Sequence, residues 1–364
     1  MQVQTRSPIP ESPKKVVICA PKCTPKLALL PALFCVSLSA FADDDKPTIN
    51  VDLQTRVSYL NDRVDNEIRH DASGFKGDYL LLMVSGQIND RISYSWRQRL
   101  NKKIDKNDKF DATDWVYVNY KADANWSFAA GKQVAMVGGY EYDRSPIDIY
   151  LASEFWNNVA PFQFGASASY TTNNGKSSFT AQVTQSLFHM PSRNDMLAYH
   201  LHWAGNYGWF NSLYSLNMIE YSPKHFISYI VLGNKFNVGN ASLELDLMNR
   251  AASHQTFFLK DCSVMARLDY RPISHLGLFG KFTYDVNRTD TDADMCVHSG
   301  TELTAFGGGV EYYPTKGNPD VRLGLSVSHA TGTNSNPSGT MLSNQTIVRL
   351  GFIAKLHLLS WKSK

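Results

Sequence analysis

The stretch FQFGASASY, residues 162–170, alternates between two kinds of side chain along its whole length. Every second position is apolar, and the positions between are polar or glycine: Phe162, Phe164, Ala166, Ala168 and Tyr170 against Gln163, Gly165, Ser167 and Ser169. Consecutive side chains of a β-strand point to opposite faces. This period of two therefore predicts a strand with one apolar and one polar face.

The same alternation recurs from residue 49 to the end of the chain, for example in 92–100, 243–247 and 264–270. It predicts 16 strands, near residues 48–60, 78–88, 91–102, 114–122, 126–134, 161–172, 177–188, 196–204, 209–220, 225–237, 240–249, 262–271, 275–287, 303–313, 320–330 and 345–358. Most approach the roughly 9–11 residues that a tilted strand needs to cross a bilayer. Their length favours a membrane barrel over a soluble sandwich.

The connections between these strands alternate between tight and long. The tight ones hold residues such as Asn89-Asp90 and Val238-Gly239, whereas most others are longer: 61–77, 103–113, 135–160, 189–195, 250–261, 288–302 and 331–344, with 221–224 as the exception. Outer-membrane barrels have short turns at one rim and long loops at the other. The sequence therefore predicts an all-β fold, an antiparallel transmembrane β-barrel of about 16 strands with short periplasmic turns and long extracellular loops.

Residues 1–42 differ in composition from the rest of the chain. Four lysines precede the apolar run 27–38, and Ala40-Phe41-Ala42 follows it as a small-residue cleavage site. A basic region, a short apolar stretch and such a site are typical of a secretory signal peptide. We predict that 1–42 is removed after export and that 43–364 forms the barrel.

Removal of 1–42 changes the charge of the chain. This segment contains five basic residues and one acidic residue, so the formal net charge falls from +3 to −1. A nucleic-acid partner then has no support from composition. The mean hydropathy is −0.29 and no later segment has 18 consecutive apolar residues, which excludes a helical membrane protein.

The longest connection, 135–160, follows the fifth predicted strand and contains apolar residues such as Ile147, Tyr150 and Phe155. A long loop with this composition is typically structured and functional. We predict that it folds into the barrel as a constriction. Its charged residues Asp143, Arg144, Asp148 and Glu154 would then set size and charge limits. The alternative is a surface loop packed on a neighbouring subunit.

Basic residues share the polar face of several predicted strands. They are Arg56, Arg97 and Arg99 on early strands and Arg267, Lys281, Arg322 and Arg349 on late ones. In a barrel of about 16 strands the polar face lines a lumen wide enough for water. A basic strip that faces an acidic loop would create a transverse field across the opening. The alternative is a set of salt bridges within the lumen.

Two cysteines, Cys262 and Cys296, follow the signal peptide, and both fall at the predicted long-loop rim. We predict a disulfide that tethers the loop between residues 287 and 303. The sequence contains no metal-binding, nucleophile-elbow or CxxC motif, so we expect neither an enzyme nor a metal or other cofactor.

The segment Asp111–Phe164 (DATDWVYVNYKADANWSFAAGKQVAMVGGYEYDRSPIDIYLASEFWNNVAPFQF) resembles the phosphate-selective porin O/P family, especially its Bacteroidota porin-like members. Weaker similarity extends to 217–221, 307–312 and 345–351. The resemblance implies a 16-stranded barrel, usually trimeric, with a loop folded into the pore. Phosphate preference in that family depends on lysine- and arginine-rich linings. The loop 135–160 departs from this pattern because Arg144 is its one arginine and Lys is absent.

These observations together predict a porin in the outer membrane of a Gram-negative bacterium. It would allow passive diffusion of small hydrophilic solutes or ions, contact outer-membrane lipid and lipopolysaccharide, and form a homotrimer without binding nucleic acid. The alternative is a structural, adhesive or receptor barrel with a closed lumen. The identity of the solute stays open.

Overall fold

A computed structural model describes residues 47–362 except 107, 189–192, 256–257, 317 and 340. Its elements are β1 Thr48–Val64, β2 Glu67–Ile68, β3 Gly74–Gln87, β4 Ile92–Arg99, β5 Thr113–Lys121, β6 Trp126–Val134, α1 Tyr140–Asp143, the 3-10 turn η1 Pro146–Asp148, α2 Glu154–Asn158, β7 Phe162–Thr171, β8 Ser177–Gln185, β9 Leu197–Asn206, β10 Phe210–Ser222, β11 His225–Val238, β12 Ala241–Ala252, β13 Asp261–Ile273, β14 Leu276–Asn287, β15 Glu302–Tyr312, β16 Val321–Thr333 and β17 Gln345–Lys362. The predicted signal peptide lies outside the described residues.

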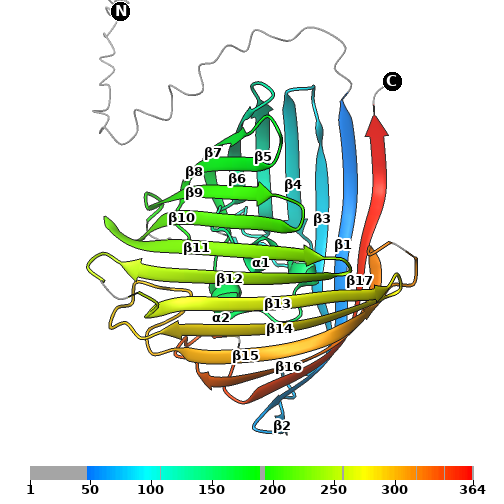
Figure 1. The fold of residues 1–364 in the computed structure, drawn as a ribbon, viewed down its shortest axis with the longest axis vertical. Coiled ribbons are helices and arrows are strands. Elements are labelled where there is room, and N and C mark those ends of the chain that lie inside the picture. Colours follow the sequence, from blue (N-terminus) through cyan, green and yellow to red (C-terminus); the bar gives the residue numbers. More distant parts are fainter. Residues whose placement is uncertain are drawn as a thin grey trace, which may run out of the picture. The chain divides into compact units, whose positions relative to one another are not determined.

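The strands form a closed antiparallel barrel (Figure 1). Each long strand pairs with the next one along the chain, and β1 closes the ring against β17 from Thr48↔Lys362 to Val64↔Gln345. The predicted fold class is therefore confirmed. β2 is a two-residue strand that pairs with the end of β1 within the first long loop, which leaves 16 long strands in the described chain.

The barrel has two different ends. The connections 88–91, 122–125, 172–176, 207–209, 239–240, 274–275 and 313–320 lie at one end, called here the short-turn end. The connections 65–73, 100–112, 135–161, 186–196, 253–260, 288–301 and 334–344, together with the tight turn 223–224, lie at the long-loop end. The first residue of β1 and the last residue of β17 pair at the short-turn end.

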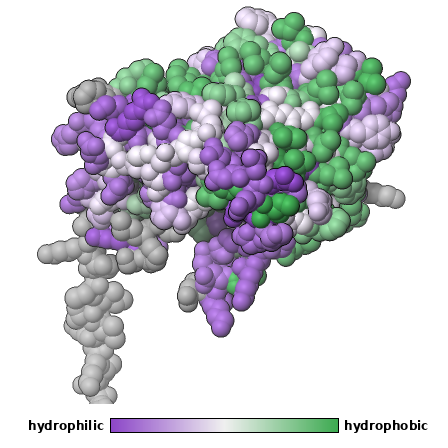
Figure 2. All heavy atoms as spheres, turned by 90° about the horizontal axis from the view of Figure 1, so that it is seen from below, coloured by the Kyte–Doolittle hydropathy of each residue, from purple (hydrophilic) through white to green (hydrophobic). Residues whose placement is uncertain are grey.

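The two faces of the wall differ in polarity as the alternation predicted. Outward-facing residues such as Leu201, Leu216, Leu268 and Phe306 are exposed apolar side chains, whereas their inward-facing neighbours are mostly polar. The molecule seen from below has hydrophobic residues over one broad area and hydrophilic residues over another (Figure 2). None of the helices in the described ranges has the length and hydrophobicity that a membrane crossing requires.

Part of the barrel interior is an apolar core. Five inward-facing wall residues in this region are almost completely inaccessible: Ile219, Ile227, Tyr229, Val231 and Met248, called here the sealed sector. Residues of three connections pack on them, including Tyr142 and Phe155 from 135–161, Phe188 from 186–196 and Val297 from 288–301. Apolar side chains on the inward face would be unfavourable in contact with water. The connections that pack on them keep water away from this part of the wall.

Candidate functional site

The segment 135–160 runs inside the barrel, where α1 and α2 lie within the ring of strands (Figure 1). The backbone N–H of Met136 donates to the side chain of Gln182 on β8, at 2.7 Å. Gly138 and Gly139 both have a φ of 87°, and a Cβ on Gly233 of β11 would lie 2.8 Å from the Cα of Gly139. The left-handed conformation and the close approach of two backbones both require glycine here.

Inward-facing acids of the wall hold the two short helices of this segment. The N–H groups of Tyr140 and Glu141 in α1 donate to the carboxylate of Asp246 at 2.9 and 2.8 Å. The N–H of Glu154 in α2 donates to Asp285 at 2.9 Å. Because the first amides of a helix have no partner within it, the two carboxylates satisfy donors that would otherwise be buried and unbonded.

Ion pairs attach the segment to β12, β14 and β16. Arg144 donates to Glu244 of β12 at 2.5 Å. Lys281 of β14 pairs with Glu141, and Arg322 of β16 pairs with Asp148. These strands stand across the ring from β6 and β7, between which the segment leaves the wall, so the segment spans the lumen.

Asp148 and Arg56 join the tip of the segment to the seam of the barrel. Lys355 of β17 lies 3.1 Å from Asp148, and Arg56 of β1 donates to the carbonyl oxygen of Ile149 at 2.6 Å. Burial acts to raise the pKa of Asp148, but the positive charges of Arg322 and Lys355 hold it below its ordinary value. Asp148 is therefore ionised at neutral pH.

The other predicted pore residues are also largely paired. Arg97 and Arg99 both donate to Asp114 at 2.7 Å, and Arg97 lies over the ring of Trp115. Arg267 makes two hydrogen bonds to Asp269. Arg349 faces inward on β17; its buried Nε donates no hydrogen bond to a described residue, and within the described residues no ion pair involves it. Asp143 is exposed, whereas Glu154 is fully buried, and burial raises its pKa.

The acidic loop and the basic strip are thus in contact. The sequence left open a transverse field across a gap or a set of salt bridges within the lumen. The pairs of Asp148 with Arg322 and of Lys281 with Glu141 correspond to the second alternative. The sequence did not predict that Asp246 and Asp285 hold the loop, because the alternation along a strand gives the direction of a side chain but not its partner.

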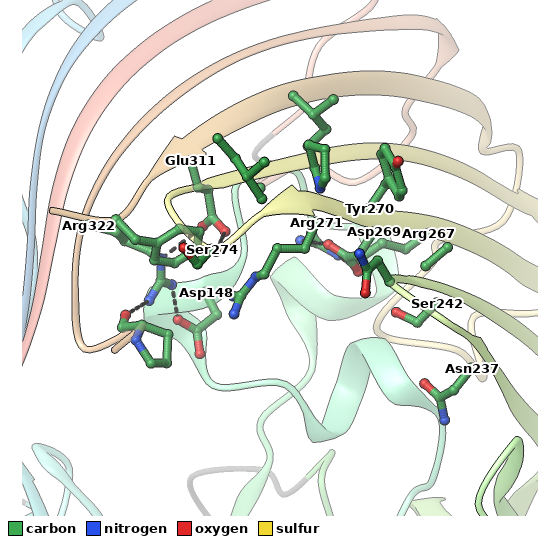
Figure 3. A pocket seen from close by; sticks show the side chains of 18 of the residues that line it. Asp148, Asn237, Ser242, Arg267, Asp269, Tyr270, Arg271, Ser274, Glu311 and Arg322 are labelled. Carbon is green, nitrogen blue, oxygen red and sulfur yellow. Dashed lines mark hydrogen bonds and ion pairs between the residues drawn. The ribbon is translucent and has the colours of Figure 1, made fainter. Parts of the chain in front are cut away.

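A vestibule of about 770 Å³ opens at the short-turn end of the barrel, and Arg144 and Asp148 of the segment 135–160 line part of it. Its walls are the inward faces of β11–β17, as Figure 3 shows for Arg271, Asp269 and Arg322. The described residues that line it include six basic side chains, Arg144, Lys235, Arg267, Arg271, Arg322 and Lys355, and three acidic ones, Asp148, Asp269 and Glu311. The vestibule therefore has an excess of positive charge. Arg271 lies 4.5 Å from the ring centre of Tyr313 and has no ion pair with any described residue.

The inward face of β4–β7 is different. It carries small hydroxyl side chains that are half-buried, namely Ser93, Ser95, Ser127, Ser167 and Ser169, called here the polar sector. In the order of the ring, β4–β7 stand opposite β12–β15. The vestibule and the polar sector thus lie on opposing walls at the short-turn end.

The predicted disulfide is wrong, because Cys262 and Cys296 are both free and buried. Ser263 faces the lumen, where it bonds to Asp285, so the side chain of Cys262 points to the opposite, outer face. Cys296 belongs to the apolar cluster inside the barrel. The wall of the barrel separates the two thiols, although both residues lie near the same rim.

The sequence profile of phosphate-selective porins O and P matches residues 49–214, somewhat under half of the chain. Over residues 49–214 the chain is similar to the porin O and P family. The sequence resemblance is therefore confirmed for this part. Among curated proteins, none matches the chain.

Solved structures of outer-membrane proteins share the fold of this porin at low sequence identity. OmpT of Vibrio cholerae has a TM-score of 0.59 and 12% identity over 86% of this chain and 99% of its own. The channel DcaP of Acinetobacter baumannii has a TM-score of 0.58 and 10% identity, over 86% of this chain and 99% of its own. An anion-selective porin from Comamonas acidovorans has a TM-score of 0.57 and 11% identity, over 86% of this chain and 99% of its own. The family match and the barrel together confirm the prediction of an outer-membrane porin.

Proposed function

We propose that this porin conducts small hydrophilic solutes by passive diffusion through a lumen that the segment 135–160 constricts, and that it catalyses no reaction. The observation that carries the proposal is the attachment of this segment to charged side chains of β1, β12, β14, β16 and β17. Attachment at many points fixes the width of the opening. A free loop would not.

The charge of the vestibule favours anions among these solutes. Six basic and three acidic side chains line it, and part of the positive charge, such as that of Arg271, is not neutralised by a described residue. A wall with an excess of one sign concentrates ions of the opposite sign in a channel. The half-buried hydroxyl groups of the polar sector would replace water as hydrogen-bond partners for solutes of either charge.

The test is single-channel current from the purified protein in a planar bilayer with a salt gradient. We expect stepwise conductance and a reversal potential on the anion side. The variant Arg144→Ala should increase the conductance, since it releases the segment from Glu244, whereas Lys176→Ala on the exposed turn 172–176 should leave it unchanged.

One observation favours the alternative, a barrel with a closed lumen. The sealed sector is a dry apolar core at the long-loop end, as in a plug. Absence of current from a correctly folded, heat-modifiable barrel would support a structural or receptor role and contradict the porin proposal.

Three further parts of the proposal concern the surroundings of the barrel. We expect a homotrimer, in which case current steps would occur in threes. The exposed apolar residues of the outer wall would contact outer-membrane lipid, and the long-loop end would contact lipopolysaccharide. Residues 1–42 would direct export and be cleaved, which N-terminal sequencing of the mature protein can check.

A further inference from the structure

The connection 288–301 between β14 and β15 also folds into the barrel, although it contains neither helix nor strand. Ala293, Cys296 and Val297 pack into the same apolar cluster as Phe155, and their exposed fractions are 1% or less. The side chain of Asn158 in α2 donates to the carbonyl oxygen of Cys296 at 3.0 Å. The two segments therefore pack against one another inside the lumen.

Asp294 is the centre of this connection. Its Oδ1 accepts from the N–H groups of Cys296 and Val297 at 2.8 and 3.2 Å and from the hydroxyl of Tyr229 at 3.1 Å. Its Oδ2 lies 2.6 Å from Nε of Arg250 on β12. One carboxylate thus shapes the turn and also attaches it to the wall.

Arg250 is completely buried and joins both inward segments. It donates to Asp261 at 2.8 Å and to the hydroxyl of Ser263 at 2.8 Å. Ser263 in turn donates to Asp285, the carboxylate that accepts from the first amide of α2. A continuous network therefore runs from 288–301 through Arg250 to the segment 135–160.

We propose that 288–301 is a second constriction element and that Arg250 and Asp294 are the positioning residues that hold it in the lumen. With 135–160 it closes the long-loop end over the sealed sector and confines solutes to the side of the polar sector. This inference rests on the proposed porin function and adds a second determinant of pore size to it.

Two contributions to the free energy keep the segment 288–301 inside the lumen. A buried ion pair that loses one partner leaves an uncompensated charge in a site of low dielectric, which is strongly unfavourable. Release of the segment would also expose the apolar residues of the sealed sector to water. Both terms oppose opening, so the segment stays inside the lumen in the unperturbed protein.

The test uses the thiol of Cys296 as a reporter. In a Cys262→Ser background, Cys296 is the remaining cysteine among the described residues, and its exposed fraction is 0%. We expect a membrane-impermeant thiol reagent to label it slowly. A cysteine placed at the exposed position 292 of the same segment (Asp292→Cys, with Cys296→Ser) should be labelled rapidly and serves as the positive control.

Asp294→Ala should release the segment. We expect Cys296 to be labelled about tenfold faster or more, because an unpaired buried charge favours opening. Single-channel conductance should rise roughly 1.5-fold or more, and larger uncharged solutes should pass in liposome-swelling assays. The matched control is Arg288→Ala, which breaks an exposed ion pair with Glu302 at the start of the same connection and should change neither readout.

Each other outcome counts against the proposal. Rapid labelling of Cys296 in the unperturbed background would show that the segment is not held inside, even if Asp294→Ala fails to fold. Faster labelling of Asp294→Ala without a change in conductance or solute size would show that the segment does not limit the pore. Equal effects of Arg288→Ala would remove the specific role of the buried pair. Absence of current from the parent protein would instead contradict the porin function itself.

Discussion

The inward face of this barrel is built in two ways, although the same alternation of residues produces both. The polar sector, on β4, β6 and β7, consists of small hydroxyl residues that remain half-buried. The sealed sector, on β10–β12, consists of large apolar residues that three connections cover. Alternation decides which face a side chain joins, but the connections decide whether that face is wet or dry.

The largest expected difference concerns a charge placed on each sector. Ile219→Glu would put a carboxylate in the dry core, where its exposed fraction is 0%, whereas Ser167→Glu would put one on the half-buried polar sector. We expect Ile219→Glu to lower the free energy of unfolding by about 3–5 kcal/mol, because an unpaired buried charge is not compensated. Ser167→Glu should lower the free energy of unfolding by less than about 1 kcal/mol. It should also shift ion selectivity toward cations.

Guanidinium unfolding of the refolded barrels in micelles measures this difference, and the reversal potential in a salt gradient reports the selectivity of Ser167→Glu. If the two substitutions had equal costs, the sealed sector would be in contact with water and the comparison would fail.

A second expected effect separates the packing of the sealed sector from its polarity. Phe155 of α2 is fully buried beside Tyr142 and Tyr229, with ring centroids 6.3 and 6.0 Å away. Phe155→Ala should destabilise the packed conformation of the segment 135–160 by about 3–5 kcal/mol, because it leaves a cavity. Limited proteolysis from the long-loop side should then cut this segment faster. Phe75→Ala is the control, since Phe75 is 85% exposed, and it should leave cleavage of this segment unchanged.

The sequence alone was sufficient for the barrel and for the orientation of its faces. Alternation such as that of 162–170 depends on local geometry, and it predicted the strands to within a few residues of their observed bounds. A two-residue addition, β2, escaped prediction because its pairing with the end of β1 follows from the course of a loop. The disulfide prediction failed for a related reason. Two cysteines near one rim can lie on opposite faces of the wall, and residue parity indicated the outer face for Cys262.

The second inward segment was not predicted, but its wall left a signal in the sequence. Residues Ile227–Leu232 read ISYIVL, in which both faces of the strand are apolar or aromatic apart from Ser228. A strand that is apolar on both faces is buried on both faces. In a barrel, this means that something inside covers it. The covering residues of 288–301 have no periodicity of their own, and their contacts depend on the pairing of Asp294 with Arg250, which is distant in sequence.

A third expected effect concerns the attachment of the segment 135–160 near the vestibule. Asp148→Asn removes the charge that pairs with Arg322 and Lys355, and it should weaken this attachment by about 1–2 kcal/mol because the carboxylate is partly accessible. The pKa of Asp148 is lowered, so its contribution is complete above the ordinary value of 3.8 and is lost as the pH falls through the still lower folded value.

The contribution of Asp148, measured as the difference in conductance between the parent protein and Asp148→Asn, should therefore stay constant from neutral pH to about the ordinary carboxyl pKa and change only below it. Asp148→Asn should show altered conductance already at neutral pH and a smaller step in acid. A conductance step well above pH 4 that disappears in Asp148→Asn would contradict the lowered pKa and the pairing from which it follows.

The smallest expected effect compares single exposed charges at the short-turn end. Arg271→Gln removes a cation of the vestibule that has no described ion-pair partner, whereas Arg91→Gln removes an exposed cation from the turn between β3 and β4 on the opposite side. Arg271→Gln should move the reversal potential toward cations by a few millivolts, and the shift should shrink at high salt, since exposed charges are screened over about 10 Å at 0.1 M. Arg91→Gln should shift it less, because Arg91 does not line the vestibule. Equal shifts of the reversal potential would mean that the net charge of the short-turn rim, and not the basic wall of β11–β17, governs ion selectivity. The two walls of the lumen would then differ in packing but not in their influence on ions.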